Sequence, residues 1–144
     1  MKSRLPLVLK LAAPVFLLVG ALHLLYGVGA DVLLGAGLSA EAISDPVLDS
    51  QNRFYGVSFT LYGVLLFLCS TDLQKYRVVL QCVIWVFFAA GLARLVSMGI
   101  YGMPSTLVLL LLASELLLPP LLAVWLRRVL SESERVRDMD GARP

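Results

Sequence analysis

Four long apolar runs constrain the fold of this chain more than any other feature of its sequence. They cover about residues 5–30, 54–70, 78–97 and 105–126. A run of about 20 apolar residues is long enough to cross the hydrocarbon core of a bilayer as a helix. Only helices or closed barrels satisfy their backbone hydrogen bonds in lipid, and these runs are continuous rather than alternating. The sequence therefore predicts an all-α integral membrane bundle of four transmembrane helices.

The composition excludes several other classes of protein. Hydrophobic residues make up 59% of the chain and charged residues 15%, whereas soluble domains have roughly 45–50% and about 25%. The net charge of +2 is small and no basic surface is interleaved with aromatics, so we expect no nucleic-acid partner. With one histidine and no metal-type cysteine spacing we expect no metal site. No cofactor fingerprint is present, so no cofactor is expected.

The first apolar run has one alternative interpretation, a cleaved signal peptide. Its start is basic, and Val28-Gly29-Ala30 resembles a cleavage site. However, the run is longer than the apolar region of about 7–15 residues that signal peptides contain. Pro14 and His23 also interrupt it. We therefore expect the run to be retained as the first transmembrane helix.

The charges in the connections predict how the bundle is oriented. The first connection, residues 31–51, is acidic and holds no Lys or Arg, whereas the second holds Lys75 and Arg77. The tail from Arg127 is rich in arginine. Because Lys and Arg favour the cytoplasmic side, both termini and the second connection are predicted to be cytoplasmic.

Two regions outside the spans have predictable structure. Ser44-Asp45-Pro46 is typical of a helix start, with Pro at the first helical position. This predicts a short outer helix between the first and second spans. Residues 1–128 are expected to form the transmembrane domain. Residues 129–144 are expected to form a charged cytoplasmic tail, at first helical and then disordered over 138–144.

Polar residues inside the apolar runs are the candidates for function. An ionisable side chain at the bilayer centre costs about 2.5–3.5 kcal/mol on insertion scales, so it usually faces a partner or a cavity. The helical rise of about 1.5 Å per residue places these residues in the outer half and near the middle. This asymmetry predicts a pocket that opens outward. The ligand-binding candidates are His23, Tyr26, Arg53, Tyr55, Tyr62, Arg94, Ser97 and Glu115.

Glu115 is the most unusual of these residues, and three interpretations remain open. It pairs with Arg94 and holds two helices together, or it contacts a ligand or a proton, or it is a lone protonated carboxyl group bonded to Tyr62. Pro119 has no N–H, so the Glu115 carbonyl loses its usual helical partner. Counting the rise per residue leaves about 10 Å between the Arg94 and Glu115 backbones along the membrane normal.

The other candidates also have a structural and a functional interpretation. Arg94 either extends toward lipid headgroups or binds an anionic group together with Arg53, which enters from the same side. His23 is either a packed, hydrogen-bonded residue or a proton carrier. Tyr26 and Tyr55 lie where aromatic anchors at the membrane interface are expected.

Four motifs in order resemble a known family. They are His23-Leu24-Leu25-Tyr26-Gly27, Asn52-Arg53-Phe54-Tyr55-Gly56, Gly91-Leu92-Ala93-Arg94-Leu95-Val96-Ser97 with Gly102-Met103-Pro104-Ser105, and Glu115-Leu116-Leu117-Leu118-Pro119-Pro120. Over residues 15–124 they resemble a bacterial inner-membrane family known as domain of unknown function 4345, which is more distantly similar to DoxX-like proteins. The resemblance implies a four-helix bundle in the bacterial inner membrane and no assigned activity. It places the family's motif residues on His23, Arg53, Tyr55, Arg94 and Glu115.

Three functions follow as hypotheses. The first is a small binding or accessory membrane protein that holds a lipid-like or amphipathic molecule in an outward-opening intramembrane pocket. The second is a membrane-embedded enzyme, an isomerase or a quinone-linked redox protein, in which Glu115 or His23 transfers the proton. The third is a purely structural or interaction subunit. Membrane lipid is the expected partner, and a second copy of the chain or another membrane protein are the alternatives for a protein partner.

Overall fold

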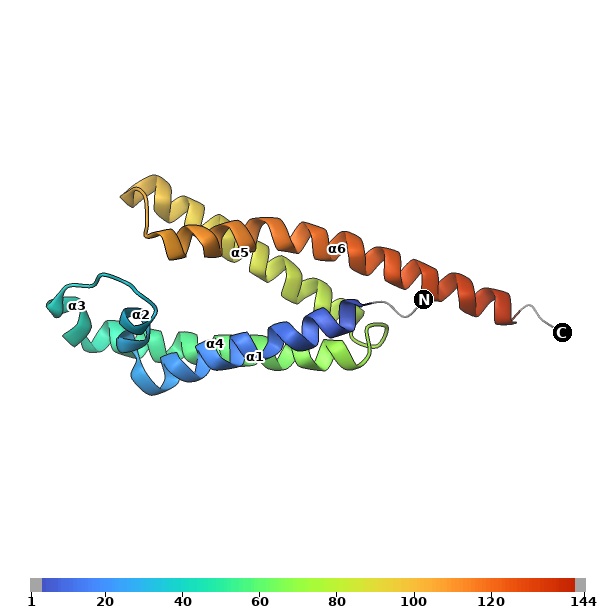
Figure 1. Ribbon diagram of the computed structural model, residues 1–144, viewed down its shortest axis with the longest axis horizontal. Helices are drawn as coiled ribbons and strands as arrows, with labels where there is room; N and C mark the ends of the chain where they lie inside the picture. Colours follow the sequence, from blue (N-terminus) through green and yellow to red (C-terminus); the bar gives the residue numbers. More distant parts are fainter. Residues whose placement is uncertain (1–3, 142–144) are drawn as a thin grey trace. The chain divides into compact units, whose positions relative to one another are not determined.

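The described part of the chain is mainly helical. The computed structural model describes residues 4–141, with side chains up to Arg135, and over this range it contains helices and no strands. Each of the four long helices is long and apolar enough to cross a membrane, which confirms the predicted all-α fold with four candidate spans. These helices are α1 (Leu5–Tyr26), α4 (Pro46–Thr71), α5 (Arg77–Tyr101) and α6 (Thr106–Gly141) (Figure 1).

The connection between the first two spans contains two short helices instead of one, α2 (Val28–Leu33) and α3 (Ala40–Ser44). The predicted helix start at Pro46 is real, but it begins the second span itself. The Asp45 carboxylate accepts hydrogen bonds from the backbone N–H groups of Val47 (2.7 Å) and Leu48 (3.2 Å), as a helix N-cap does. The second span therefore begins at Pro46 rather than near residue 54.

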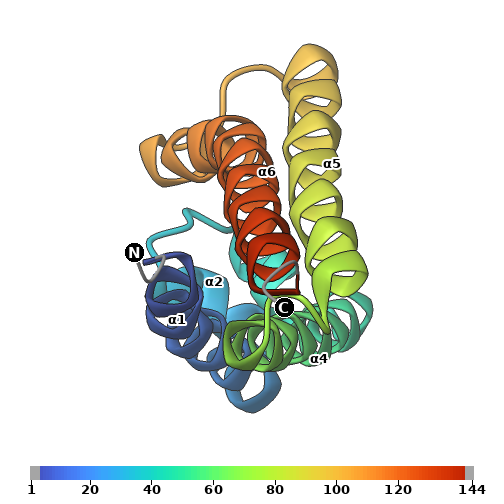
Figure 2. The ribbon, with the colours of Figure 1, turned by 90° about the vertical axis from the view of Figure 1, so that its right-hand side faces the viewer.

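The chain divides into two compact units. One is Leu7–Leu68, here called the α1–α4 unit. The other combines the segment up to Pro6 with the chain from Cys69 onward and is called the α5–α6 unit. Within the α1–α4 unit, the two long helices lie side by side (Figure 2). Glycines make this close approach possible, since a Cβ on Gly56 would lie 2.7 Å from the Leu24 nitrogen and 2.9 Å from the Gly20 carbonyl oxygen. Small residues allow helix backbones to approach in this way in membranes.

The α5–α6 unit is an antiparallel pair joined by a tight turn. The backbone reverses at Gly102, whose φ of 91° favours glycine and whose N–H donates to the Met98 carbonyl at 3.0 Å. Farther along the pair, Gly91 of α5 faces the side chains of Glu115 and Leu116 of α6. This register sets which polar residues of the two helices meet.

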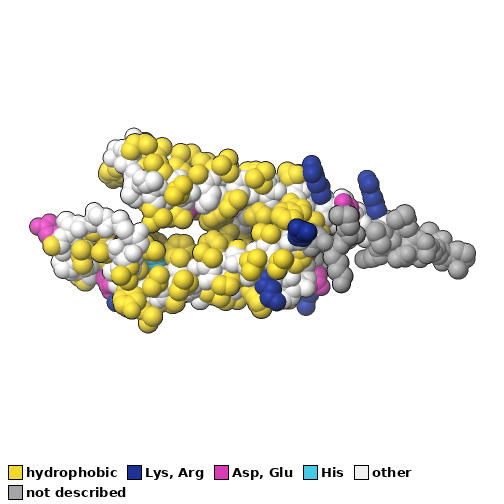
Figure 3. All heavy atoms as spheres, in the orientation of Figure 1, with side chains coloured by type: hydrophobic (Ala, Val, Ile, Leu, Met, Phe, Trp, Pro, Cys, Tyr) yellow, Lys and Arg dark blue, Asp and Glu magenta, His cyan; other side chains and the backbone are white. Residues whose placement is uncertain are grey.

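Apolar side chains cover the outside of both units. Leu11, Leu61, Val86 and Leu110 each expose more than half of their surface, and many other large apolar residues are also exposed. The face in Figure 3 is mainly hydrophobic over both helix pairs, and the Lys and Arg atoms visible there lie toward the helix ends. Because a soluble monomer rarely exposes such continuous apolar surface, the chain is a multi-pass membrane protein. Its orientation in the membrane stays a prediction.

The tail beyond residue 128 continues the last helix. Helix α6 extends to Gly141, so the first part of the segment predicted to be disordered, 138–144, is helical up to that residue. Residues 142–144 lie outside the described part of the chain, and the prediction for them is not tested.

Candidate functional site

Arg94 and Glu115 form a direct ion pair between α5 and α6. The Arg94 Nε donates to Glu115 Oε2 at 2.8 Å and to Oε1 at 3.0 Å. The Glu115 residue is only 5% exposed, whereas the Arg94 side chain is 35% exposed. The carboxylate is thus the buried anchor of the pair, and the guanidinium extends outward from it.

The separation of about 10 Å expected along the membrane normal does not fit this direct contact between the two side chains. Counted from the shared turn, Arg94 is eight residues before Gly102 and Glu115 is ten residues after Ser105. A difference of two residues corresponds to about 3 Å along the helix axis, so the two side chains lie at nearly the same level.

Only one of the three guanidinium nitrogens of Arg94 is used in this pair. Both carboxylate oxygens bond to Nε, and the terminal Nη1 and Nη2 groups make no hydrogen bond among the described residues. An arginine has five N–H donors in a planar fork. Four of them therefore have no partner among the described residues.

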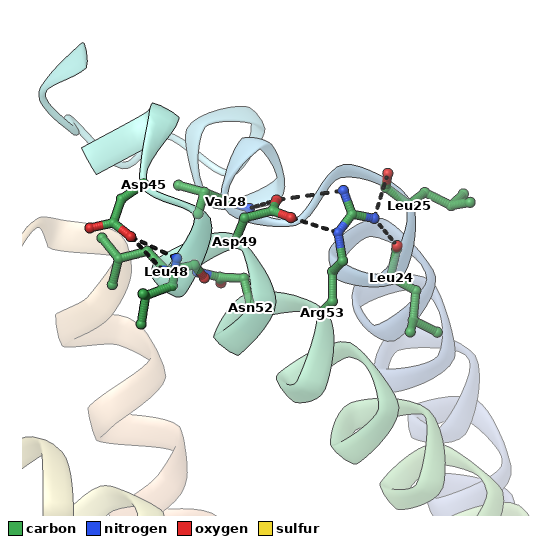
Figure 4. Close-up of polar contacts among 9 residues, drawn as sticks. Leu24, Leu25, Val28, Asp45, Leu48, Asp49, Asn52 and Arg53 are labelled. Atoms are coloured by element: carbon green, nitrogen blue, oxygen red, sulfur yellow. Dashed lines mark hydrogen bonds and ion pairs between the residues drawn. The ribbon is translucent and has the colours of Figure 1, made fainter. Parts of the chain in front are cut away.

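Arg53 is part of a different arrangement, at the end of α1 (Figure 4). Its Nε donates to Asp49 Oδ2 at 2.8 Å, and its Nη1 donates to the carbonyls of Leu24 at 2.7 Å and Leu25 at 3.4 Å. On the other side, Asp49 Oδ1 accepts the backbone N–H of Val28 at 3.4 Å. The pair thus places its cation on the last carbonyls of α1 and its anion on the first N–H of α2.

This placement matches the unpaired backbone groups at helix ends. The last four carbonyls of a helix and the first four N–H groups of the next have no partner inside the helix, and the helix dipole favours a cation at the former and an anion at the latter. Gly27 separates α1 from α2 with a φ of 54°, and a Cβ there would overlap the Asp49 carboxylate. Arg53 is therefore engaged with its own unit and stabilises the break between α1 and α2.

His23 is buried, at 5% exposure, and both of its ring nitrogens have a neighbour. Nδ1 lies 2.8 Å from the Val19 carbonyl, and Nε2 lies 3.3 Å from Asp31 Oδ1. Because the carbonyl can only accept, Nδ1 carries a proton. The ring is thus held between a backbone carbonyl on one side and a carboxyl group on the other.

The neutral candidates are dispersed. Tyr62 packs against Phe16, with ring centroids 4.7 Å apart, and the Tyr55 hydroxyl accepts from the Gln51 side chain at 3.2 Å. Tyr26 and Ser97 are exposed. Their ligand-binding role stays a prediction, because the structure brings together Arg94 with Glu115 and no larger set of the candidate residues within either unit.

Two surface hollows have none of the predicted site residues in their lining. One, of about 540 Å³, lies beside the first turns of α4 and includes Gln51 and Phe54. The other, of about 350 Å³, lies between α5 and α6 and includes Gln81, Trp85 and Arg127. In the described part of the chain, no three His, Cys, Asp or Glu side chains are grouped so as to hold a metal ion.

The family comparison decides the classification of this chain. The family model described as domain of unknown function DUF4345 matches residues 5–126, which includes all four motifs found in the sequence. The chain belongs to the DUF4345 family. No curated protein and no solved structure matches it. The DUF4345 match covers α1 to α5 and α6 as far as Leu126, so the Arg94–Glu115 pair and the Arg53–Asp49 pair both lie within the family domain.

Sequence reasoning missed two acidic residues of this DUF4345 chain. Asp49 and Asp31 were both assigned to an acidic loop, whereas they contact Arg53 and His23. The spacing of Asp49 and Arg53, four residues, is that of neighbours on one helix face. Extending the second span back to the helix start at Pro46 would have identified this pair.

Proposed function

We propose that this DUF4345 protein is a non-enzymatic membrane protein that binds a lipid-like or amphipathic molecule by its polar end at Arg94. The observation that carries the proposal is the one-sided use of the guanidinium. Glu115 bonds to Nε alone and leaves the Nη1 and Nη2 groups without a partner among the described residues. The buried carboxylate positions the arginine, and the exposed fork is available for a ligand.

The membrane makes these available donors significant. Hydrocarbon supplies no acceptors, so an N–H group there is satisfied by protein, by water or by a polar part of an amphipathic molecule. Two adjacent N–H groups of a guanidinium bind two oxygens of one acceptor group in a defined geometry, which an ammonium group does not do. The ligand would therefore place a group with paired oxygens against Arg94 and its apolar part against the surrounding helices.

Charge balance narrows the class of ligand. Glu115 already neutralises Arg94, because the two ions are 2.8 Å apart. A further full negative charge at this site would be only partly compensated, whereas an uncharged or zwitterionic acceptor adds no net charge. We therefore favour a polar end such as an ester, an amide or a zwitterionic headgroup over a free anion.

The test compares ligand-induced stabilisation in the parent protein and in Arg94→Lys. The full chain is purified in detergent, retained lipids are identified by native mass spectrometry, and the melting temperature is measured as each lipid is added back. We expect one class of amphipathic molecule to be retained and to raise the melting temperature. Arg94→Lys keeps the charge opposite Glu115 but lacks the fork, and its affinity should fall about tenfold, the loss expected for hydrogen bonds to a charged group.

Glu115→Gln measures the structural contribution of the pair, and Arg94→Lys separates this proposal from a purely structural role. Loss of an interhelical ion pair should destabilise the α5–α6 unit by about 2 kcal/mol in either case. Only a binding site also loses ligand-induced stabilisation in Arg94→Lys. A parent protein that retains no amphipathic molecule and is stabilised by none contradicts the proposal and favours the structural subunit.

A second candidate is a membrane-embedded enzyme with His23 as the proton carrier, and the contact between His23 Nε2 and the Asp31 carboxyl group at 3.3 Å favours it. Because His23 is the only histidine in the chain, its ring gives a single set of nitrogen resonances in a labelled sample. An acid–base catalyst must lose and regain a ring proton in the working pH range. A ring that keeps both protons between pH 5 and about 9, where a free imidazole would have lost one, would contradict catalysis and indicate a structural hydrogen bond.

A further inference from the structure

A groove lies between α5 and α6, at the end of the pair far from the Gly102 turn. Its volume is about 350 Å³. Residues of both helices line it, among them Gln81, Cys82, Trp85, Ala123 and Arg127. All of them belong to the α5–α6 unit, so the groove is complete within that unit.

The groove has two polar residues, Gln81 and Arg127, near its mouth, and the rest of its lining, which includes Val78 and Ile84, is mainly apolar. Because the helices are antiparallel, a residue earlier in α5 lies opposite a residue later in α6. Arg94 lies opposite Glu115 in this way. Gln81 and Arg127 are thus at one level, and Trp85 and Ala123 are one turn farther in, about 6 Å toward the membrane centre. This gradient matches a lipid, with a polar headgroup at the mouth and an acyl chain inside.

The described residues supply no counter-charge for Arg127 at the mouth of the groove. No hydrogen bond or ion pair engages Arg127 or Gln81 among the described residues, and no Asp or Glu lines the groove. This distinguishes Arg127 from Arg94 and Arg53, each of which faces a carboxylate of its own unit. An unpaired guanidinium beside an amide group is complementary to a phosphate that carries a full negative charge.

We propose that this groove binds an anionic phospholipid of the bilayer, with its phosphate at Arg127 and Gln81 and an acyl chain along Trp85 and Ala123. Arg127 lies at the arginine-rich end of the helices, which the charge pattern predicts to be cytoplasmic. Anionic lipids give that leaflet its negative surface potential and attract juxtamembrane basic residues. The site is separate from Arg94 in position and in charge, so either proposal can fail without the other.

Fluorescence quenching of Trp85 tests the lipid preference directly. The chain has two tryptophans, so Trp125→Phe leaves Trp85 as the single reporter. The full chain is reconstituted in phosphatidylcholine vesicles that contain a small fraction of either brominated phosphatidylglycerol or brominated phosphatidylcholine. We expect the anionic lipid to quench with an apparent affinity about fivefold higher, the preference expected from one basic residue at an anionic surface.

Three variants in the Trp125→Phe background identify the source of any preference. Arg127→Gln should reduce the ratio of the two apparent affinities to one. Arg128→Gln removes the same charge from a neighbour that does not line the groove, and it should leave this ratio unchanged. Ala123→Leu fills the apolar part of the groove without changing its charge, and it should also abolish the lipid preference. Equal quenching by the two lipids in the parent would overturn the proposal. So would an equal loss in Arg127→Gln and Arg128→Gln, since that would show a general attraction to basic surface.

Discussion

The two units of this protein hold their helices together by different means. In the α1–α4 unit the helix backbones touch at glycines, and the polar contacts are at the helix ends, where Arg53 and Asp49 bond to backbone groups. In the α5–α6 unit the contact at Gly91 is with side chains, and an ion pair lies between the helices. Both solve the same problem, which is that lipid supplies no hydrophobic force to drive helices together.

The difference shows which unit has polar groups available for a ligand. Close packing of helix backbones needs no side-chain donors. In the α1–α4 unit, the polar residues at the helix ends form hydrogen bonds with backbone groups. The ion pair between α5 and α6 is made by side chains and leaves part of the arginine exposed. Both sites proposed for this protein, at Arg94 and at Arg127, therefore lie on the α5–α6 unit.

The strongest test of this comparison is Gly56→Ala. The added Cβ would lie 2.7 Å from the Leu24 nitrogen and 2.9 Å from the Gly20 oxygen, and a helix backbone cannot yield without separating from its neighbour. We expect a loss of about 2 kcal/mol in the free energy of unfolding, as for other overpacked sites. The measurement is reversible unfolding in mixed micelles, followed by circular dichroism.

Gly99→Ala is the matched control for this substitution. Nothing lies within 4 Å of a Cβ at Gly99, which is also inside a helix. It should be neutral or slightly stabilising, because alanine favours the helix more than glycine does. If Gly56→Ala were as stable as Gly99→Ala, close glycine packing would not hold α1 against α4.

Gly91→Ala should have a smaller effect. The added Cβ would meet the Leu116 side chain at 2.9 Å and Glu115 Cβ at 3.0 Å, and the leucine can change its rotamer. The gain in helix propensity, up to about 1 kcal/mol, offsets much of the crowding, so we expect a net change within about 1 kcal/mol. The same unfolding experiment measures it, and a loss equal to that of Gly56→Ala would remove the distinction between the two units.

The smallest effect is expected for Arg53→Gln. The side chain is about half exposed, and its bonds to the Leu24 and Leu25 carbonyls act on one helix end. A cation at such an end contributes roughly 0.5 kcal/mol. The effect should therefore be local, and it should be detected as faster hydrogen exchange at the backbone amides of Gly27 and Val28. Arg128→Gln should leave these amides unchanged, and a large global loss of stability in Arg53→Gln would instead assign Arg53 a role in holding the whole unit.

Much of the architecture was predictable because a membrane span can be identified from the amino-acid composition of a short segment. Runs of about 20 apolar residues identified four spans without any knowledge of their packing. The start of α4 was also present in the sequence, since Asp45 and Pro46 are a typical helix start, but the polar stretch after it was assigned to a loop. Asp49 was missed for this reason, and with it the partner of Arg53.

The sequence by itself determined that this protein lies in lipid, and it identified the small set of polar residues within the apolar spans. A run of leucines must be helical in lipid whatever surrounds it, so its identity as a span depends on no tertiary contact. Only the tertiary structure decided that Arg94 pairs with Glu115, that Arg53 bonds to the end of α1, and that Arg127 has no partner among the described residues. The physical reason is that a helix apolar on every side does not record which side faces its neighbour. The Gly102 turn set the register that brought Arg94 to Glu115, and the glycines of α1 and α4 set the approach that let Arg53 reach Leu24.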